Sequence, residues 1–276
     1  MAIEGNTLSL KQVTDIIDGK RVVAPLREIQ EVKNAIAAYD LFSELDPFSV
    51  PDLLKAHNVM MTALIEEPGK FRKGGVGVSD GKQVVHIAPP AALVPGQIKD
   101  LFHWLKSAPD HLLIKSCVFH YEFEFIHPFA DGNGRLGRLW QSLILTQLNP
   151  VFQNLPVETM VHDNQPEYYR AINASSAKND CGIFVDFMLN EILNALKQHI
   201  SGTSIGTGNP VLGLFCQRDV IILENNNVLD IELKFRCRII MQRQKNLFLN
   251  YFIKRNIHTL FSFHSCRKCF VSYGRF

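Results

Sequence analysis

A glycine-rich turn leads directly into an apolar segment between His127 and Leu148, and this arrangement constrains the fold more than any other stretch. The turn and the start of the segment read HPFADGNGRLGR. Residues 139–148 are apolar on several sides, which is typical of a helix buried in the middle of a domain. We therefore predict a central buried helix that begins at Gly132 or Asn133 and fixes the side chains of its first turns.

The residues of this turn favour phosphate chemistry. Glycine turns leave backbone N–H groups free to face an anion, and the start of a helix adds its positive dipole end. Arg135 and Arg138 are three residues apart, so both guanidinium groups would project from one helix face toward phosphates. Asp131 would repel a polyphosphate unless a divalent cation lay between them, and Mg²⁺ prefers such oxygen ligands. Histidine titrates near neutral pH, so His127 is suited to accept a proton from a hydroxyl.

Two other interpretations of the turn compete with this one. Gly132, Gly134 and Gly137 also match the GxGxxG dinucleotide-binding pattern, and residues 119–125 alternate like a preceding strand. However, an intervening proline and acid separate that alternation from the first glycine, and no series of βαβ units follows. A capped surface turn is the plainest alternative, but it leaves an asparagine, an acid and two arginines unexplained.

The motif resembles a known family. HxFx(D/E)GNGRxxR is the signature of the Fic (Fic/Doc) family, and every specified position matches, namely His127, Phe129, Asp131, Gly132, Asn133, Gly134, Arg135 and Arg138. The flanking sequences HYEFEFIHPF and GRLWQSLIL, and most of the chain from Glu4 to about residue 200, are also similar to that family. The resemblance implies an all-α fold: a Fic-type helical bundle with a small β-hairpin flap before the motif. The structure of the C-terminal tail is not predicted by it.

The resemblance implies that the chain is a protein adenylyltransferase, which transfers AMP from ATP to a Ser, Thr or Tyr hydroxyl of a target protein. His127 would be the general base, and Asp131 would hold Mg²⁺, with ATP as the co-substrate. The ATP phosphates would be bound by Gly132, Asn133, Gly134, Arg135 and Arg138. Phe129 would anchor the loop in the core.

Other activities stay open. Within enzymes, the same scaffold could transfer a phosphoryl group, another nucleotide or phosphocholine, or could remove AMP from a modified protein. A function of another class is a nucleotide-sensing regulatory protein whose basic tail contacts nucleic acid. The expected partners are ATP and a target protein whose identity the sequence does not give, with self-modification and a homodimer as further expectations.

The N-terminal sequence IEGN resembles the end of the inhibitory helix (S/T)xxxE(G/N) of Fic proteins. In that family the glutamate lies on the second arginine of the motif, so Glu4 and Gly5 are expected to be inhibitory, with Glu4 on Arg138. The Ser or Thr of the pattern would stand one residue before Met1. Either the start is earlier or the helix is shortened and its restraint weaker. The alternative is that Glu4 is a solvated terminal residue.

The family resemblance and the apolar periodicity together predict the domain organisation. Residues 1–64 would form an N-terminal helical part that includes the inhibitory segment 1–6, and residues 65–200 would form the core, with the motif at 127–138. Helices are predicted over residues 8–17, 25–38, 50–64, 94–107, 111–125, 165–175 and 183–200. We expect His57 and His120 to be structural, whereas Tyr168 and Tyr169 could line an adenine pocket.

A hairpin is predicted in the flap at residues 70–88, because β-branched residues flank Asp80 and Gly81. In the family this hairpin holds the target protein by strand addition, so its exposed edge would be a docking surface. The residues expected to dock the target are Val76, Gly77, Val78, Val84 and Val85.

The chain changes character at a linker over residues 201–210. Residues 1–209 hold 18 Lys and Arg against 23 Asp and Glu, whereas residues 210–276 hold 11 against 4 and no alanine. The basic tail, residues 211–276, could be a small module for nucleic acid or an acidic partner. It could also hold zinc through Cys266, Cys269 and a nearby histidine, His264 or His258. We favour a third interpretation, that the tail is not an evolved domain, because the change in composition is abrupt.

The composition is that of an ordinary globular protein, with 46% hydrophobic and 20% charged residues. The sequence contains no signal-like N-terminus and no apolar run near the length of a membrane span. We therefore expect a cytoplasmic protein with no membrane partner and with reduced cysteines.

Overall fold

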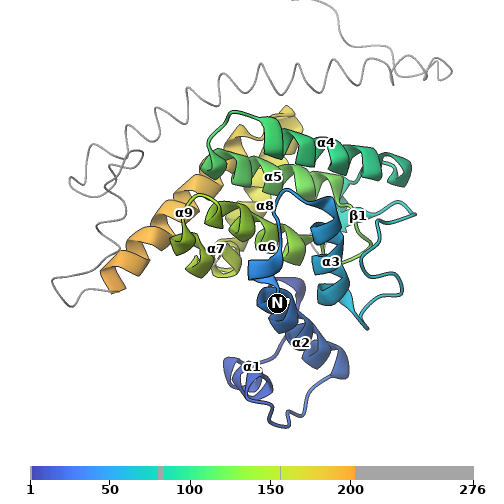
Figure 1. Ribbon diagram of the computed structural model, residues 1–276, viewed down its shortest axis with the longest axis vertical. Helices are drawn as coiled ribbons and strands as arrows, with labels where there is room; N and C mark the ends of the chain where they lie inside the picture. Colours follow the sequence, from blue (N-terminus) through green and yellow to red (C-terminus); the bar gives the residue numbers. More distant parts are fainter. Residues whose placement is uncertain (1, 80–83, 156, 203–276) are drawn as a thin grey trace, which may run out of the picture. The chain divides into compact units, whose positions relative to one another are not determined.

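The computed structural model describes residues 2–79, 84–155 and 157–202, and α-helices make up most of them (Figure 1). The chain divides into two units, Met1–Ser204 and Ile205–Phe276. The predicted tail, with its candidate zinc ligands, lies outside the described residues, as does most of the predicted linker. The domain boundaries therefore remain predictions.

The helices of the described unit follow one another along the chain with short connections. They are α1 (Leu10–Ile17), α2 (Leu26–Asp40), α3 (Val50–Met61), α4 (Val94–Ser107), α5 (Leu112–Ile126), α6 (Asn133–Thr146), α7 (Val157–Asp163), α8 (Gln165–Lys178) and α9 (Gly182–Gly202). Short 3-10 turns lie at η1 (Ala2–Glu4), η2 (Phe42–Glu44), η3 (Ala91–Leu93) and η4 (Pro150–Asn154). The predicted all-α class is confirmed.

Helices α5 and α6 form the centre of the unit and pack against each other (Figure 1). Nearly every residue of α6 is buried, as predicted for the segment that follows the glycine turn. Trp140 of α6 is fully buried, and its indole N–H donates to the carbonyl of Pro47 at 3.1 Å. Since most of α6 is buried, its position is fixed by close packing in the core.

Helix α3 ends earlier than predicted, at Met61 instead of residue 64. The hydroxyl of Thr62 donates back to the carbonyl of Asn58 at 2.6 Å, and Ala63 follows with a φ of 60°. A left-handed residue stops helical hydrogen bonding. The apolar pattern continues past this point, so it did not reveal the stop.

The predicted hairpin is present as two antiparallel strands, β1 (Gly77–Ser79) and β2 (Val84–Ile87). Gly77 pairs with Ile87, and Ser79 pairs with Val84. The side chains of residues 77–87 lie outside the described part, so the docking role of Val78, Val84 and Val85 remains a prediction.

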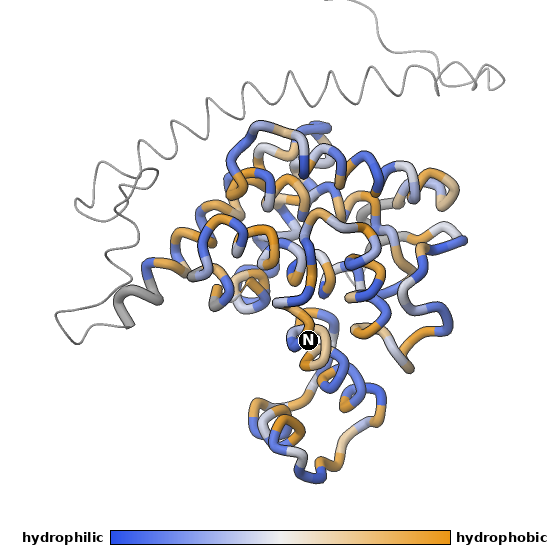
Figure 2. Tube along the Cα trace, viewed as in Figure 1, coloured by the Kyte–Doolittle hydropathy of each residue, from blue (hydrophilic) through white to orange (hydrophobic). Residues whose placement is uncertain are grey.

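Helix α1 lies beside α2 and away from the central helices (Figure 1). Ser9 and Gln12 form a reciprocal capping box at its start, which explains why the helix begins there. None of its residues is buried, and Leu10 is 83% exposed. Figure 2 colours part of α1 as hydrophobic, and since no residue of α1 is buried, the predicted apolar face of this helix lies outside the core. Among the helices of the described residues, none combines the length and the apolar character that crossing a membrane requires.

Candidate active site

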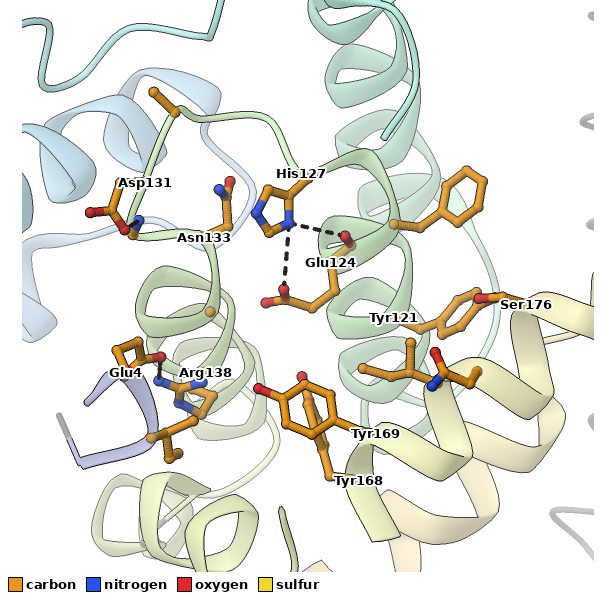
Figure 3. Close-up of a pocket in the computed structure, with 17 residues that line it drawn as sticks. Glu4, Tyr121, Glu124, His127, Asp131, Asn133, Arg138, Tyr168, Tyr169 and Ser176 are labelled. Carbon is orange, nitrogen blue, oxygen red and sulfur yellow. Dashed lines mark hydrogen bonds and ion pairs between the residues drawn. The ribbon is translucent and has the colours of Figure 1, made fainter. Parts of the chain in front are cut away.

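A cavity with a volume of about 220 Å³ lies at the start of α6 (Figure 3). Four parts of the chain line it: the N-terminal turn, the end of α5, the motif and α8. Its lining residues are Ile3, Glu4, Tyr121, Glu124, Phe125, His127, Ala130, Asp131, Gly132, Asn133, Gly134, Arg138, Tyr168, Tyr169, Ile172, Asn173 and Ser176.

The backbone of His127 places its ring in this cavity. His127 follows α5 with φ 49° and ψ 63°, a left-handed conformation that is uncommon for a residue with a side chain. Its Nδ1 lies 3.3 Å from the carbonyl oxygen of Glu124. Because a carbonyl oxygen only accepts, this contact assigns the ring proton to Nδ1. The lone pair of Nε2 is then able to accept a proton.

The guanidinium of Arg72 holds the peptide of His127 in place. Its Nε donates to the carbonyl of His127 at 2.8 Å, and a terminal nitrogen donates to that of Ile126 at 3.3 Å. The other donors of Arg72 reach the carbonyls of Gly74 and Pro89, on either side of the hairpin. One buried arginine therefore joins the base of the hairpin to the backbone of the histidine.

The motif loop is fixed by side chains that do not face solvent. Phe129 is fully buried and stacks on His57, with ring centroids 3.6 Å apart. The amide of Asn133 donates to the carbonyl of Phe129 and accepts from its N–H, both at 2.9 Å. Since both polar atoms of this amide bind the loop, its predicted role toward phosphate would fall on the backbone N–H.

His57 joins the loop to α3. Its Nδ1 accepts from the N–H of Gly69 at 2.8 Å, so Nε2 carries the proton and donates to the carbonyl of Asp131 at 3.0 Å. Burial lowers the pKa of His57 to about 4, which keeps the ring neutral. His57 therefore supports the loop as a packed residue, as the sequence indicated.

Gly132 is the N-cap of α6 and needs to be glycine for two reasons. Its φ is 83°, and a Cβ at this position would stand 2.6 Å from the sulfur of Met61. The first N–H groups of α6 have no acceptors within the helix, and Asn133 and Gly134 line the cavity. The start of a helix attracts anions, and phosphate binding at this one remains a prediction.

Arg138 lies beside this helix start and is 2% exposed. It forms an ion pair with Glu4 through a terminal nitrogen (Figure 3). Its Nε donates to Glu158 of α7 at 2.6 Å. Burial lowers the pKa of Arg138, but the two carboxylates outweigh this effect and raise it. The glutamate of the N-terminal turn is therefore in contact with the arginine expected from the sequence.

The other motif arginine does not line the cavity. Arg135 is 5% exposed and pairs with Asp131 at 3.3 Å, four residues earlier. Residues three apart on a helix diverge by about a sixth of a turn, so Asp131 engages Arg135 and Arg138 faces the cavity. The two arginines, which were expected to bind phosphate together, thus have different partners: Arg135 pairs with Asp131, and Arg138 pairs with Glu4.

Asp131 could contribute one ligand to a metal. Its side chain is 40% exposed at the cavity and also pairs with Arg27 of α2 at 3.3 Å. Within the described ranges no group of three side chains is placed to hold a metal ion. A single carboxylate fits Mg²⁺ that is bound mainly by substrate phosphates and water, and does not fit a metal held by protein alone.

Both predicted tyrosines of α8 line the cavity (Figure 3). The hydroxyl of Tyr168 lies 3.0 Å from Nε2 of the fully buried His120, whose Nδ1 contacts the amide oxygen of Gln141 at 2.5 Å. Since that oxygen only accepts, Nδ1 carries the proton and Tyr168 donates to Nε2. Burial lowers the pKa of His120 to about 4, so His120 is the neutral core support that the sequence indicated.

Four residues at the site were not found by reasoning from the sequence: Arg27, Arg72, Glu124 and Glu158. Glu124 did carry a signal, because a carboxylate in the otherwise apolar run FEFI is unusual for a buried helix. The other three carried none, since each reaches the motif from a different, distant element.

Comparisons with known proteins place part of the chain in a family. The Fic/DOC family profile matches residues 47–145. The chain is 31% identical to protein adenylyltransferase fic-1 of Caenorhabditis briggsae over 77% of this chain, and 30% identical to that of Caenorhabditis elegans over 76%. It spans 42% and 41% of these relatives, about two fifths of their length.

Solved structures of Fic proteins have the same fold. A Fic family protein from Desulfovibrio desulfuricans G20 is similar with a TM-score of 0.71 and 50% identity, covering 75% of this chain and 64% of that one. Fic-1 (aa134–508) from C. elegans is similar with a TM-score of 0.60 and 27% identity, covering 73% of this chain and 60% of that one. The chain therefore carries a Fic/DOC family domain, with the family match at residues 47–145.

Proposed function

We propose that this chain transfers AMP from ATP to a hydroxyl group of a target protein. The observation that carries the proposal is the convergence, in one cavity, of the Nε2 lone pair of His127, the start of α6 and Arg138. The relatives named protein adenylyltransferases support this reaction over others on the same scaffold.

The chain's own residues would bind, orient and move a proton. The α6 N–H groups and Arg138 bind the phosphates through charge-assisted hydrogen bonds. Nε2 of His127 takes the proton of a Ser, Thr or Tyr hydroxyl, whose oxygen bonds to the α-phosphorus while the bond to pyrophosphate breaks. Positioning and electrostatics supply most of the acceleration in such transfers. Tyr168 and Tyr169 line the part of the cavity suited to the base of the nucleotide.

Mg²⁺ belongs to this proposal because Asp131 fits a phosphate-bridging ion. The ion would neutralise charge on the phosphate oxygens. Arg27 is 57% exposed on its side chain and can leave Asp131 without disturbing the core. The buried Arg135 would keep its ion pair with the carboxylate of Asp131.

We also propose that Glu4 inhibits the transfer. Its carboxylate oxygen lies 3.0 Å from the position of a Cβ on Gly134, over the first turn of α6, and pairs with Arg138. A carboxylate in this position would compete with phosphate for Arg138 and the start of α6. With the N-terminal turn in place the cavity, at about 220 Å³, is smaller than the roughly 300–1,000 Å³ of typical ligand pockets.

The target protein would dock on the hairpin by strand addition. We also propose that the protein is cytoplasmic. Neither a second copy of the chain nor nucleic acid is needed for this chemistry.

Incubation of the protein and a lysate with ATP labelled at the α- or the γ-phosphate tests the reaction. Label from α-labelled but not γ-labelled ATP is expected, and His127→Ala should remove it. Label from γ-labelled ATP would instead indicate phosphoryl transfer.

A further inference from the structure

Glu124 is a cavity residue that the mechanism above does not use. It lies in the last turn of α5, three residues before His127, and its side chain is 13% exposed. Its Oε1 is buried and has no hydrogen-bond partner within the described part of the chain. A carboxylate that is buried without a hydrogen bond for one oxygen is costly, so a compensating role is expected.

Figure 3 shows Glu124 and His127 facing each other across the edge of the cavity. The backbone carbonyl of Glu124 lies 3.3 Å from Nδ1 of His127, and its carboxylate Oε2 lies 3.9 Å from the same nitrogen. The carbonyl fixes the proton on Nδ1, and the carboxylate stands beside that proton. One residue therefore contacts the ring twice, on the side opposite to Nε2.

Gly137 of α6 makes room for this arrangement. A Cβ on Gly137 would stand 2.7 Å from Oε1 of Glu124, closer than real Cβ contacts allow. A side chain at position 137 would therefore displace the carboxylate of Glu124 from its place beside the ring of His127.

The other charged and titratable groups around Glu124 come from five elements. They are His120 of α5, with Nε2 3.9 Å from Oε1, Arg138 of α6, Glu4 of η1, Glu158 of α7 and Tyr168 of α8. Burial raises the pKa of Glu124 to about 7, and Arg138 opposes this effect. Near neutral pH, a positive charge on the ring of His127 would therefore favour the ionised form of Glu124.

We propose that Glu124 is a positioning residue for the transfer, which orients the ring of His127 and stabilises the imidazolium formed when Nε2 takes the hydroxyl proton. The proton on Nδ1 stays in place throughout, and the proton on Nε2 leaves with pyrophosphate or to water. In serine proteases, an aspartate orients the catalytic histidine in a similar way through its Nδ1. This inference rests on the proposed function only for the step in which the hydroxyl reacts.

The first test measures catalysis in the full chain with Glu124→Gln, which keeps shape and removes charge. The rate constant kcat should fall about ten- to a hundredfold, a part of the 10²–10⁴ that a general base supplies. The KM for ATP should stay unchanged. Glu124→Asp, which keeps the charge but retracts it, should recover part of the rate. A loss confined to the KM would mean that Glu124 binds the nucleotide and would overturn the proposal.

The matched control is Glu122→Gln. Glu122 is on the same helix and burial raises its pKa to about 7 as well, but it does not line the cavity. Its variant should keep the wild-type kcat. An equal loss in both variants would show a general effect of the α5 carboxylates and would overturn the specific role of Glu124.

The second test needs no activity. The ring protons of His127 are titrated by NMR in the wild type, Glu124→Gln and Glu122→Gln. The midpoint of the His127 titration should fall by about one pH unit or more in Glu124→Gln alone, because an opposite charge at this distance favours the charged ring. An unchanged midpoint overturns the proposal. If the wild type transfers no AMP but the midpoint falls, the pairing stands and the proposed function fails.

Discussion

Replacement of Glu4 by Gln gives the most direct measure of the N-terminal turn. The substitution keeps the size of the side chain but removes the charge that pairs with Arg138. Arg138 keeps its second carboxylate, Glu158, at 2.6 Å, so its positive charge stays compensated in the core. The change should therefore weaken the docking of the turn without unfolding the domain.

The size of the effect follows from the contact. A hydrogen bond to a charged group contributes about 1.5–3 kcal/mol. The side chain of Glu4 is 27% exposed, so solvent screening favours the lower part of this range. Because about 1.4 kcal/mol is a factor of ten in an equilibrium constant, the population with the turn displaced should rise roughly ten- to fortyfold. The rate of transfer should rise by the same factor as long as the displaced state is the minor one.

The assay follows AMP transfer from α-labelled ATP, with initial rates for the wild type, Glu4→Gln and Glu44→Gln. Glu44 pairs with Lys55 at 3.1 Å on an exposed surface and lines no part of the cavity, so its variant should keep the wild-type rate. Asn6→Ala removes the amide that donates to Glu31 at 2.9 Å and so loosens the turn from outside the site. It should raise the rate by a smaller factor. Equal rates for the wild type and Glu4→Gln would refute the inhibitory contact.

Three further predictions concern stability. Gly132→Ala should lower Tm more than Gly19→Ala, since both glycines have positive φ but only Gly132 meets the sulfur of Met61; equal shifts in a thermal melt would contradict the steric argument. Glu122→Gln should raise Tm at pH 8, because the pKa of Glu122, about 7 in the folded state, makes the wild type lose stability as pH rises through 7. The advantage of the variant should vanish below about pH 4.5. A gain in Tm that does not depend on pH would exclude ionisation of Glu122 as its cause. A chain that ends at Ser204 should melt cooperatively and keep its transfer rate, and an unfolded product by circular dichroism would show that the first unit does not fold alone.

The sequence was sufficient for those parts that depend on local pattern. The turn before α6, its glycine N-cap and the burial of α6 follow from the order of glycines and apolar residues. The contact of Glu4 with Arg138 followed only from the family resemblance, because 134 residues separate the two. The spacing predicts that Arg135 faces the phosphates, whereas the structure pairs it with Asp131, since spacing on a helix does not show which neighbour a side chain contacts. Arg72 and Glu158 act on the motif from other elements, and this depends on tertiary packing that periodicity does not encode.

The position of Arg72 bears on how far the hairpin can change without changing the backbone of His127. Its guanidinium contacts the carbonyls of Gly74 and Pro89, where the hairpin leaves and rejoins the domain, and also that of His127. The two ends of the segment between Gly74 and Pro89 are therefore held by the same side chain. We expect that a hairpin of different sequence can be grafted there with the backbone of His127 unmoved, provided that its two ends return to Arg72.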